Sequence, residues 1–310
     1  MSSTAKEIPL CHQAWEYECP AAGGIVVGVD DSIESVAAVR TAAVIARRRR
    51  IPLHAVRVIP PVASYHINPG VEFSERNAAR IRFSIQESEL RGIISTLNPA
   101  DTWTVEVTTG TAAPGIIKIA EAHRAELIVV GRHQHGLTDR IFGADTALQV
   151  MRMASVPVLA VGTEMKTVRT VVVAVDFSVA SLAAAKQSIA ILGGSGNLFL
   201  AAVTPGHEVQ PGGFPVPADE ELSTDLASSF RHFIGALQAP IGTLVEPCVL
   251  TGRTVPCLTE YAERVGADMI ATGSHARSTL QRLLLGSVSA GLVRNATCPV
   301  LVAPPGAPIF

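Results

Sequence analysis

The chain has 310 residues, of which 48% are hydrophobic, 17% charged and 5% aromatic, a length that accommodates two ordinary domains with separate cores. Its formal net charge of −2 argues against nucleic acid or an anionic membrane surface as a partner. No apolar run approaches the roughly 20 residues that a bilayer span requires, and the N-terminus lacks the charged-then-apolar order of a signal peptide, so we expect a cytoplasmic protein.

The first predicted elements are an extension, a buried strand and a capped helix. Residues 1–23 have no match elsewhere in the sequence and are interpreted as an N-terminal extension. The continuous apolar run from Ile25 is typical of a strand buried on both faces. Ser32 is placed to cap the following helix, and Arg47–Arg50 end that helix where cations suit the negative end of its dipole. A second strand is predicted from Leu53.

The rest of the first half continues this alternation of strands and helices. A third strand precedes Gly110, a third helix starts near Pro114, and a fourth strand ends at Gly131. A last helix and the strand Pro157–Val161 complete the unit. Residues 162–167 form a short polar stretch, which we interpret as a linker.

The second half of the chain repeats the first. The segment IVVGVDDS of the first half corresponds to VVVAVDFS in the second, and the correspondence continues to the closing strands. The matched pairs include Asp30 with Asp176, Gly110 with Gly252, Pro114 with Pro256, Gly131 with Gly273, and Arg152 with Arg294. A repeat of this length indicates a duplicated domain. We predict a first domain at residues 24–162 and a second at residues 168–305.

Two helices of the second half have clear apolar faces. Ser178 is placed to cap the first of them, which stops at Gly193–Gly194. Its apolar positions are Leu182, Ala185, Ile189 and Leu192. A strand from Leu198 and a loop rich in proline and glycine lead to the second helix. The apolar positions of that helix are Leu222, Leu226, Phe230, Phe233 and Leu237. The strand Pro299–Ala303 closes the unit.

This element order predicts an α/β fold of two tandem, doubly wound parallel sheets of Rossmann-like type. Such sheets bind ligands at the carboxyl ends of their strands, where the direction of winding reverses. Asp176 follows the first strand of the second half, and Gly273 follows the fourth. If these two strands are neighbours, the acid and the glycine loop face one crevice.

The five cysteines contain no CxxC pair, and their odd number argues against a disulfide framework. Cys248 and Cys298 lie in strand-like runs and are interpreted as small buried hydrophobic residues. Cys11 and Cys19 lie in the extension, where a disulfide or a metal is the alternative to two free thiols. We predict no metal site formed by protein side chains alone.

The segment from Gly273 to Ser289 resembles the ATP-binding signature of the universal stress protein family. That signature is a glycine, two residues, a glycine, nine residues, a glycine, and then serine or threonine. Gly273 matches the first glycine and Gly286-Ser287 the last pair, whereas Ala276 replaces the middle glycine. The resemblance covers nearly all of residues 25–162 and 169–304.

The resemblance implies that the second domain binds ATP, with Asp176 at the adenosine moiety, the backbone of Val203 at adenine, and Gly252 beside the ribose or phosphates. Glycines let the backbone approach phosphate oxygens, and a helix N-terminus attracts anions. The hydroxyls of Ser287 and Ser289 can donate to phosphate, cap the helix, or do both. The predicted nucleotide-binding residues are Ala174, Asp176, Val203, Gly252, Gly273, Ser274, His275, Ala276, Gly286, Ser287, Val288 and Ser289. Mg²⁺ is expected only as a companion of the phosphates.

The first domain departs further from the signature. Its ungapped register puts Gln134, Ala144 and Asp145 at the positions of Ala276, Gly286 and Ser287, and an aspartate repels phosphate. A shift of one residue places Gly143-Ala144 there instead, without the hydroxyl. The residues of a second, less complete nucleotide site in this domain are Gly28, Asp30, Val58, Gly110, Gly131 and Gly143.

We therefore expect an ATP-binding protein of regulatory type, in which nucleotide shifts conformation or partner choice. Because no general base stands ready to activate water, any ATP hydrolysis should be slow. The resemblance also implies that the closing strands pair the two copies into a pseudo-dimer, and free strand edges favour that contact or a homo-oligomer. The alternatives are an interaction module that binds no nucleotide, and an enzyme that acts on an adenylated substrate.

Overall fold

Parallel strands form the centre of both repeats in the computed structural model, which describes residues 23–60, 72–97, 103–132, 146–165, 167–205, 220–274 and 285–306. The strands of the first repeat are β1 (Ile25–Gly28), β2 (Leu53–Ile59), β3 (Thr104–Thr109), β4 (Leu127–Gly131) and β5 (Val158–Val161). Those of the second are β6 (Thr170–Ala174), β7 (Gly196–Thr204), β8 (Thr243–Thr251), β9 (Met269–Gly273) and β10 (Val300–Ala303). Valine, isoleucine and leucine dominate the central strands because both faces are covered by helices.

The strand order explains where a ligand can enter each repeat. Within the described residues the sheet runs β3-β2-β1-β4-β5-β10-β9-β6-β7-β8. The strands of each repeat pair in parallel, and the chain reverses its direction of winding between β1 and β4 and again between β6 and β9. The predicted doubly wound α/β fold is confirmed, and the first and fourth strands of each repeat are neighbours.

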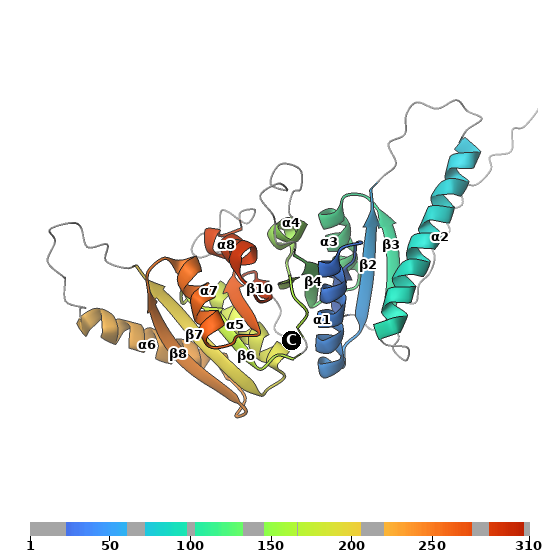
Figure 1. Cartoon of the computed structure of the whole chain (residues 1–310). Helices are drawn as coiled ribbons and strands as arrows, with labels where there is room; N and C mark the ends of the chain where they lie inside the picture. Colours follow the sequence, from blue (N-terminus) through green and yellow to red (C-terminus); the bar gives the residue numbers. More distant parts are fainter. Residues whose placement is uncertain are drawn as a thin grey trace, which may run out of the picture.

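The closing strands join the two repeats. β5 pairs with β10 in antiparallel orientation, with Leu159 opposite Leu301, so that one sheet runs through the chain (Figure 1). This is the pseudo-dimer that the resemblance implies. The pairing also occupies both edges of β5 and of β10, so the predicted homo-oligomer through the closing strands has no free strand edge there. Within the described sheet, the outer strands are β3 and β8.

Helices cover both faces of this sheet. On one face lie α1 (Ile33–Arg49), α2 (Glu72–Leu97), α5 (Val179–Leu192) and α6 (Glu220–Leu237). On the other lie α3 (Ala112–Ala122), α4 (Thr146–Met153), α7 (Thr254–Arg264) and α8 (Ser287–Asn295). The buried side chains on each face form one cluster that contains residues of both repeats. The hydrophobic core therefore continues across the junction.

The helix ends agree with the sequence signals. The hydroxyls of Ser32 and Ser178 accept hydrogen bonds from backbone N–H groups three residues later and so cap α1 and α5. Gly193 ends α5 at a left-handed φ of 65°, which glycine adopts without steric cost. Phe230, Phe233 and the other apolar positions of α6 whose side chains are described pack on the sheet.

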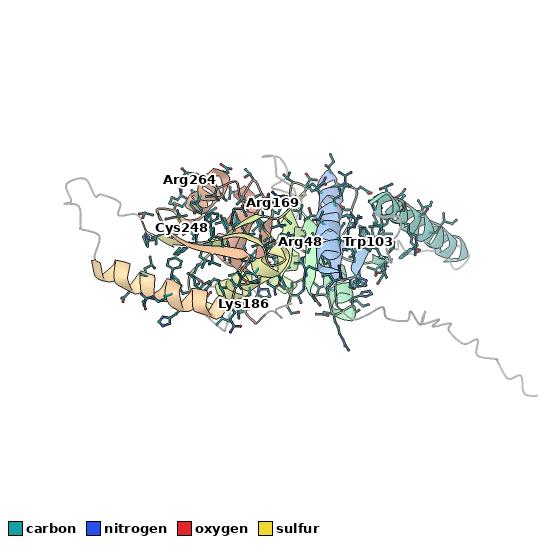
Figure 2. All side chains as sticks on the ribbon, turned by 90° about the horizontal axis from the view of Figure 1, so that it is seen from below. Arg48, Trp103, Arg169, Lys186, Cys248 and Arg264 are labelled. Atoms are coloured by element: carbon teal, nitrogen blue, oxygen red, sulfur yellow. The ribbon has the colours of Figure 1, made fainter. Side chains whose placement is uncertain are left out.

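The basic run at the end of α1 makes contacts within the first repeat and one contact across the junction. The side chain of Arg48, which Figure 2 labels, donates to the carbonyl of Val168 in the second half at 3.1 Å. The Arg47 guanidinium lies 5.6 Å from the centre of the Trp103 ring, and Arg49 pairs with Glu126 at 3.4 Å. Besides ending α1, as predicted, these three arginines therefore make specific contacts with other parts of the chain.

The interpretation of two cysteines as buried strand residues is only partly correct. Cys298 precedes β10 rather than lying in it, and both Cys298 and Cys248 are half-buried. Cys248 lies in β8, an outer strand that has one uncovered edge. Cys11, Cys19 and nearly all of the extension are outside the described residues. Among the helices of the described part of the chain, none combines the length and the apolar character needed to cross a bilayer.

Two stacked histidines lie at the amino ends of the first-repeat strands. The rings of His54 and His123 are 3.9 Å apart between centroids, and the Glu106 carboxylate accepts a hydrogen bond from His123. His54 Nδ1 lies 2.6 Å from the hydroxyl oxygen of Thr104. Burial, and next the repulsion from His123, lower the pKa of His54 below its ordinary value of 6.5.

The lowered pKa of His54 predicts that acid weakens the fold. As the pH falls below about 6.5, the unfolded chain takes up a proton at His54 that the folded chain refuses, so the free energy of unfolding decreases. Melting temperatures measured from pH 8 to pH 5.5 should fall less steeply in His54→Gln than in the wild type. The exposed His232→Gln is the control and should keep the wild-type slope; equal slopes in all three proteins would contradict this prediction.

Candidate functional site

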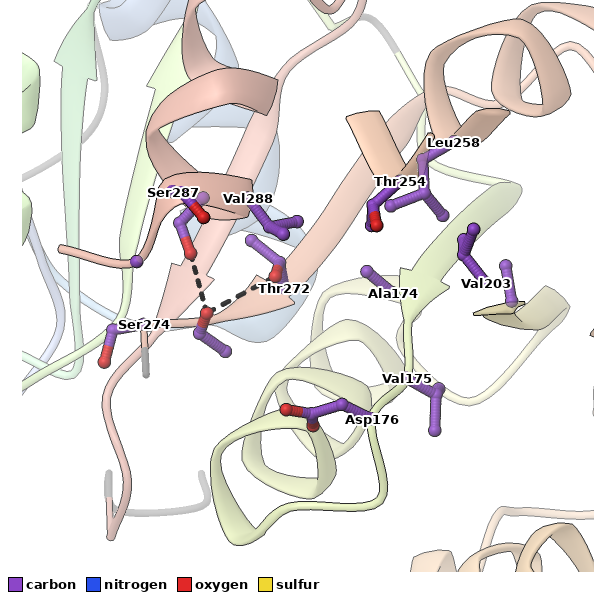
Figure 3. A pocket seen from close by; sticks show the side chains of 14 residues that line it. Ala174, Val175, Asp176, Val203, Thr254, Leu258, Thr272, Ser274, Ser287 and Val288 are labelled. Carbon is purple, nitrogen blue, oxygen red and sulfur yellow. Dashed lines mark hydrogen bonds between the residues drawn. The ribbon is translucent and has the colours of Figure 1, made fainter. Parts of the chain in front are cut away.

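A pocket of about 270 Å³ lies where the winding of the second repeat reverses, at the carboxyl ends of β6 and β9 (Figure 3). The first turns of α7 and α8 complete its wall. The described lining residues are Ala174, Val175, Asp176, Ala201, Val203, Thr254, Leu258, Thr272, Gly273, Ser274, Gly286, Ser287, Val288 and Ser289. The position agrees with the general rule for ligand sites in doubly wound sheets.

Most residues predicted for the second-domain site come together around this pocket. The predicted residues among its lining are Ala174, Asp176, Val203, Gly273, Ser274, Gly286, Ser287, Val288 and Ser289. Gly252 is not among the lining residues. His275 and Ala276 lie outside the described residues, as does the remainder of the loop up to residue 284.

The sequence argument missed five lining residues: Val175, Ala201, Thr254, Leu258 and Thr272. Strand geometry gives a signal for Ala201, because it lies two residues from Val203 and so points to the same face of β7. Helix geometry gives one for Thr254 and Leu258, which are four residues apart and share one side of α7. The glycine motif alone does not indicate that β7 and α7 contribute to the site.

Asp176 is held in position at the mouth of the pocket. One carboxylate oxygen accepts hydrogen bonds from the backbone N–H of Ser178 at 3.1 Å and from its hydroxyl at 2.6 Å. No partner of the second oxygen is found among the described residues. Asp30 makes the corresponding pair of hydrogen bonds with Ser32 in the first repeat. The acid is therefore both a turn-stabilising residue and a fixed acceptor.

A strained residue follows Asp176. Phe177 has a φ of 60°, a left-handed value that costs energy for any residue other than glycine. Its ring packs edge-on against Phe230 and Phe233 of α6, with centroid distances of 5.1 and 5.9 Å. This aromatic contact stabilises the turn that directs Asp176 toward the pocket, whereas the first repeat has Asp31 in the corresponding place.

Gly273 is required by packing of the protein itself. A Cβ atom there would lie 2.6 Å from the Cβ of Ala180 and 2.9 Å from the backbone nitrogen of Ser181, in the first turn of α5. Gly131 of the first repeat meets α1 in the same way, 2.9 Å from the nitrogen of Ser35. In both repeats this glycine therefore admits a helix, and Gly273 also lines the pocket, so its predicted contact with phosphate stays a prediction.

Gly252 and Gly110 are explained by backbone conformation. Their φ values are 139° and 144°, in a region that side chains rarely adopt. Both lie at the turn that leads from the third strand of a repeat into the helix after it. Gly252 thus shapes the approach to α7, whose residues Thr254 and Leu258 line the pocket, without lining it.

The N-terminus of α8 forms the polar end of the pocket. Ser287 is its first residue and is exposed, so its hydroxyl is accessible to a ligand. Ser289 is buried, and its hydroxyl donates to the carbonyl of Gly273 at 2.8 Å. The hydroxyl of Ser289 therefore ties α8 to the end of β9, whereas phosphate contact by either serine stays a prediction. The first N–H groups of any helix lack intrahelical partners and attract anions.

The first repeat arranges its matching residues differently. Asp30 and Val58 line another cavity, of about 470 Å³, together with the buried Arg57 and residues of α2. Arg57 forms ion pairs with Asp31 and Glu89. Gly28, Gly110 and Gly131 are not among the lining residues of that cavity, and Gly143 lies outside the described residues.

Ile116 packs closely against Gly28 in the first repeat. A Cβ atom on Gly28 would lie 2.7 Å from the Cδ1 atom of Ile116. In the second repeat the corresponding residues, Ala174 and Leu258, both line the open pocket. The two halves therefore share the fold but differ in the residues that line their cavities.

The universal stress protein family matches the chain twice, at residues 23–162 and 167–304. The chain belongs to this family. The two matches span most of the sequence and coincide with the two halves of the sheet.

Similar proteins share the tandem organisation over their whole length. A universal stress protein of Mycolicibacterium smegmatis is 28% identical, with 91% of this chain and 97% of that protein covered. A universal stress protein of Mycobacterium tuberculosis is also 28% identical, with 90% and 94% covered. The crystal structure of a universal stress protein from Archaeoglobus fulgidus has the same fold, with a TM-score of 0.63, 18% identity, and coverage of 92% and 97%.

The close approach at Gly273 predicts that Gly273→Ala lowers the free energy of unfolding by about 1–3 kcal/mol, the usual cost of forcing atoms into a packed site. Gly235→Ala is the control: this exposed glycine of α6 has open space around it, so the change should stabilise the helix by about 0.5–1 kcal/mol. Urea unfolding followed by circular dichroism measures both. A Gly273→Ala protein as stable as the wild type would show that α5 does not lie against this glycine.

Proposed function

We propose that this universal stress protein binds ATP, or another adenine nucleotide, in the pocket of its second domain and serves a regulatory role. The observation that carries the proposal is the meeting of Asp176 and the N-terminus of α8 at one pocket. The former is a fixed hydrogen-bond acceptor, and the latter is an anion-binding end of a helix. The two ends of the pocket match the ribose and the phosphates of a nucleotide.

The chemistry of the lining supports the same orientation. Ala174, Val203 and Leu258 gather at one end, where an apolar base would be removed from water (Figure 3). Ser287 lies at the other end, with Asp176 at the rim between them. In this orientation the free oxygen of Asp176 accepts a hydrogen bond from a ribose hydroxyl, and the hydroxyl of Ser287 donates to phosphate.

Charge balance gives Mg²⁺ a place in the proposal. Asp176 is the one charged side chain among the described lining residues, so none of them neutralises a triphosphate. The amides of α8 supply part of the positive potential. A Mg²⁺ ion carried by the phosphates would supply more, and it fits a site without a carboxylate cage because Mg²⁺ keeps several waters.

The proposed role is regulation. Asp176 is also the one lining carboxylate in the described part of the pocket, and its fixed oxygen is engaged with Ser178. No second carboxylate or histidine stands beside it there to share the work of activating water. We therefore expect ATP hydrolysis to be slow at most. Nucleotide binding would instead favour one conformation or one partner of the protein.

Negative charge at the start of α8 should weaken binding. Ser287→Glu places a carboxylate beside the phosphates, and two like charges about 4 Å apart repel by about 1 kcal/mol in water and about 4 kcal/mol near a protein surface. ATP affinity measured by calorimetry with Mg²⁺ should fall at least about tenfold. Ser155→Glu, the same change at an exposed serine of the first domain, should leave affinity unchanged. A Ser287→Glu protein with wild-type affinity would remove α8 from the site.

A matched pair of aspartates tests which repeat binds. Asp176→Ala and Asp30→Ala each delete a carboxylate that accepts hydrogen bonds from the serine two residues later, so their effects on the free energy of unfolding should be similar. Only Asp176→Ala should weaken ATP binding. The expected loss of affinity is about two- to tenfold, which corresponds to the free energy of one hydrogen bond. An equal loss in Asp30→Ala would mean that the first repeat holds nucleotide as well.

A further inference from the structure

Arg132 is a buried cation at the junction of the two repeats. It follows β4 directly, and only 1% of its surface is exposed. The corresponding residue of the second repeat is Ser274, a small residue that lines the pocket. The backbone N–H of Arg132 donates to the carbonyl of Val161, so the residue is anchored in the sheet at the point where the repeats meet.

The guanidinium of Arg132 reaches into the second domain. Nη1 donates to the carbonyl of Val293 at 2.7 Å, and Nη2 donates to the carbonyl of Cys298 at 3.4 Å. The fit is close, because a Cβ atom on Gly162 would lie 2.9 Å from Nη2. A buried guanidinium is stable only when its N–H groups find acceptors, so these contacts constrain where the acceptors lie.

The acceptor Val293 belongs to the last turn of α8. Carbonyl groups in the last turn of a helix have no intrahelical donor, and a cation suits the negative end of the helix dipole. Arg132 therefore caps α8 from the other domain. Its planar fork can serve two carbonyls at once, which a lysine ammonium on a flexible stem does less well.

The opposite end of α8 lines the pocket. The helix has nine residues and is therefore about 14 Å long, and Leu292 and Val293 are buried in the core of their face of the sheet. Its first turn is tied to β9 by the hydrogen bond from Ser289 to Gly273. A helix held at both ends moves as one body, so a contact at its C-terminus fixes the position of its N-terminal amides.

We propose that Arg132 is a positioning residue of the second-domain pocket: through α8, the first domain sets the geometry of the anion-binding end. The proposal rests on the proposed function, because it assigns Arg132 a part in nucleotide affinity. It also gives the first repeat a purpose that does not depend on nucleotide binding of its own. Loss of the contact leaves α8 with a free C-terminal end and a less defined N-terminus.

The test uses the full-length chain with three substitutions. Arg132→Met removes the guanidinium and keeps an apolar stem, and Arg132→Lys keeps a cation that can reach one carbonyl. Arg294→Met is the control, because it removes an exposed cation from the same last turn of α8. Amide hydrogen exchange of peptides covering Ser287–Asn295 is measured without nucleotide, and ATP affinity is measured by calorimetry at a temperature where every variant is folded.

The expected result is faster exchange in α8 and an ATP affinity at least about fivefold lower in Arg132→Met, with Arg132→Lys intermediate and Arg294→Met like the wild type. Unchanged exchange in Arg132→Met overturns the contact itself. Faster exchange with unchanged affinity overturns the positioning role. If the wild type binds no ATP, the proposed function fails, and the assignment of Arg132 to the pocket fails with it; the exchange data then decide only whether Arg132 holds α8.

Discussion

The antiparallel pairing of β5 with β10 is the constraint on which the rest of the structure depends. It turns two five-stranded sheets into one and lets the buried side chains of each face form a single cluster. It also fixes how far apart the two switch points lie. Because the sheet is continuous, side chains of the first repeat reach the second: Arg132 contacts α8, and Arg48 contacts Val168 just before β6.

Duplication produced the same backbone twice, but the two halves do not offer the same site. At the switch point of the second repeat Ala174 and Leu258 leave a pocket, whereas Ile116 packs against Gly28 in the first. The difference lies in how these side chains pack and not in their volume, because isoleucine and leucine are isomers and glycine is smaller than alanine. The cavity of the first repeat is lined instead by Asp30, Val58 and the buried Arg57.

Much of the fold could be predicted from the sequence, because its determinants are local and occur twice. The apolar runs of the central strands, the caps Ser32 and Ser178, and the stop at Gly193 all act within a few residues, and the strands and the caps occur in both repeats. The neighbouring positions of Asp176 and Gly273 followed from the rule for doubly wound sheets.

What the sequence could not predict lies in contacts between distant elements. Gly273 is glycine because α5 approaches it, and a motif that names the residue does not say which neighbour demands it. Arg132 has no matching arginine in the second repeat, so a comparison of the two halves does not identify it as a functional residue. The apolar run around Cys298 predicts a strand there, but β10 begins only after Pro299.

The most direct test of the central claim is calorimetric titration of the wild-type chain with ATP and Mg²⁺. The asymmetry of the two switch points predicts one nucleotide per chain. A stoichiometry near two would contradict the proposal that nucleotide binds in the second repeat alone. No heat, together with no shift in melting temperature, would leave a universal stress protein whose pocket does not serve adenine nucleotides.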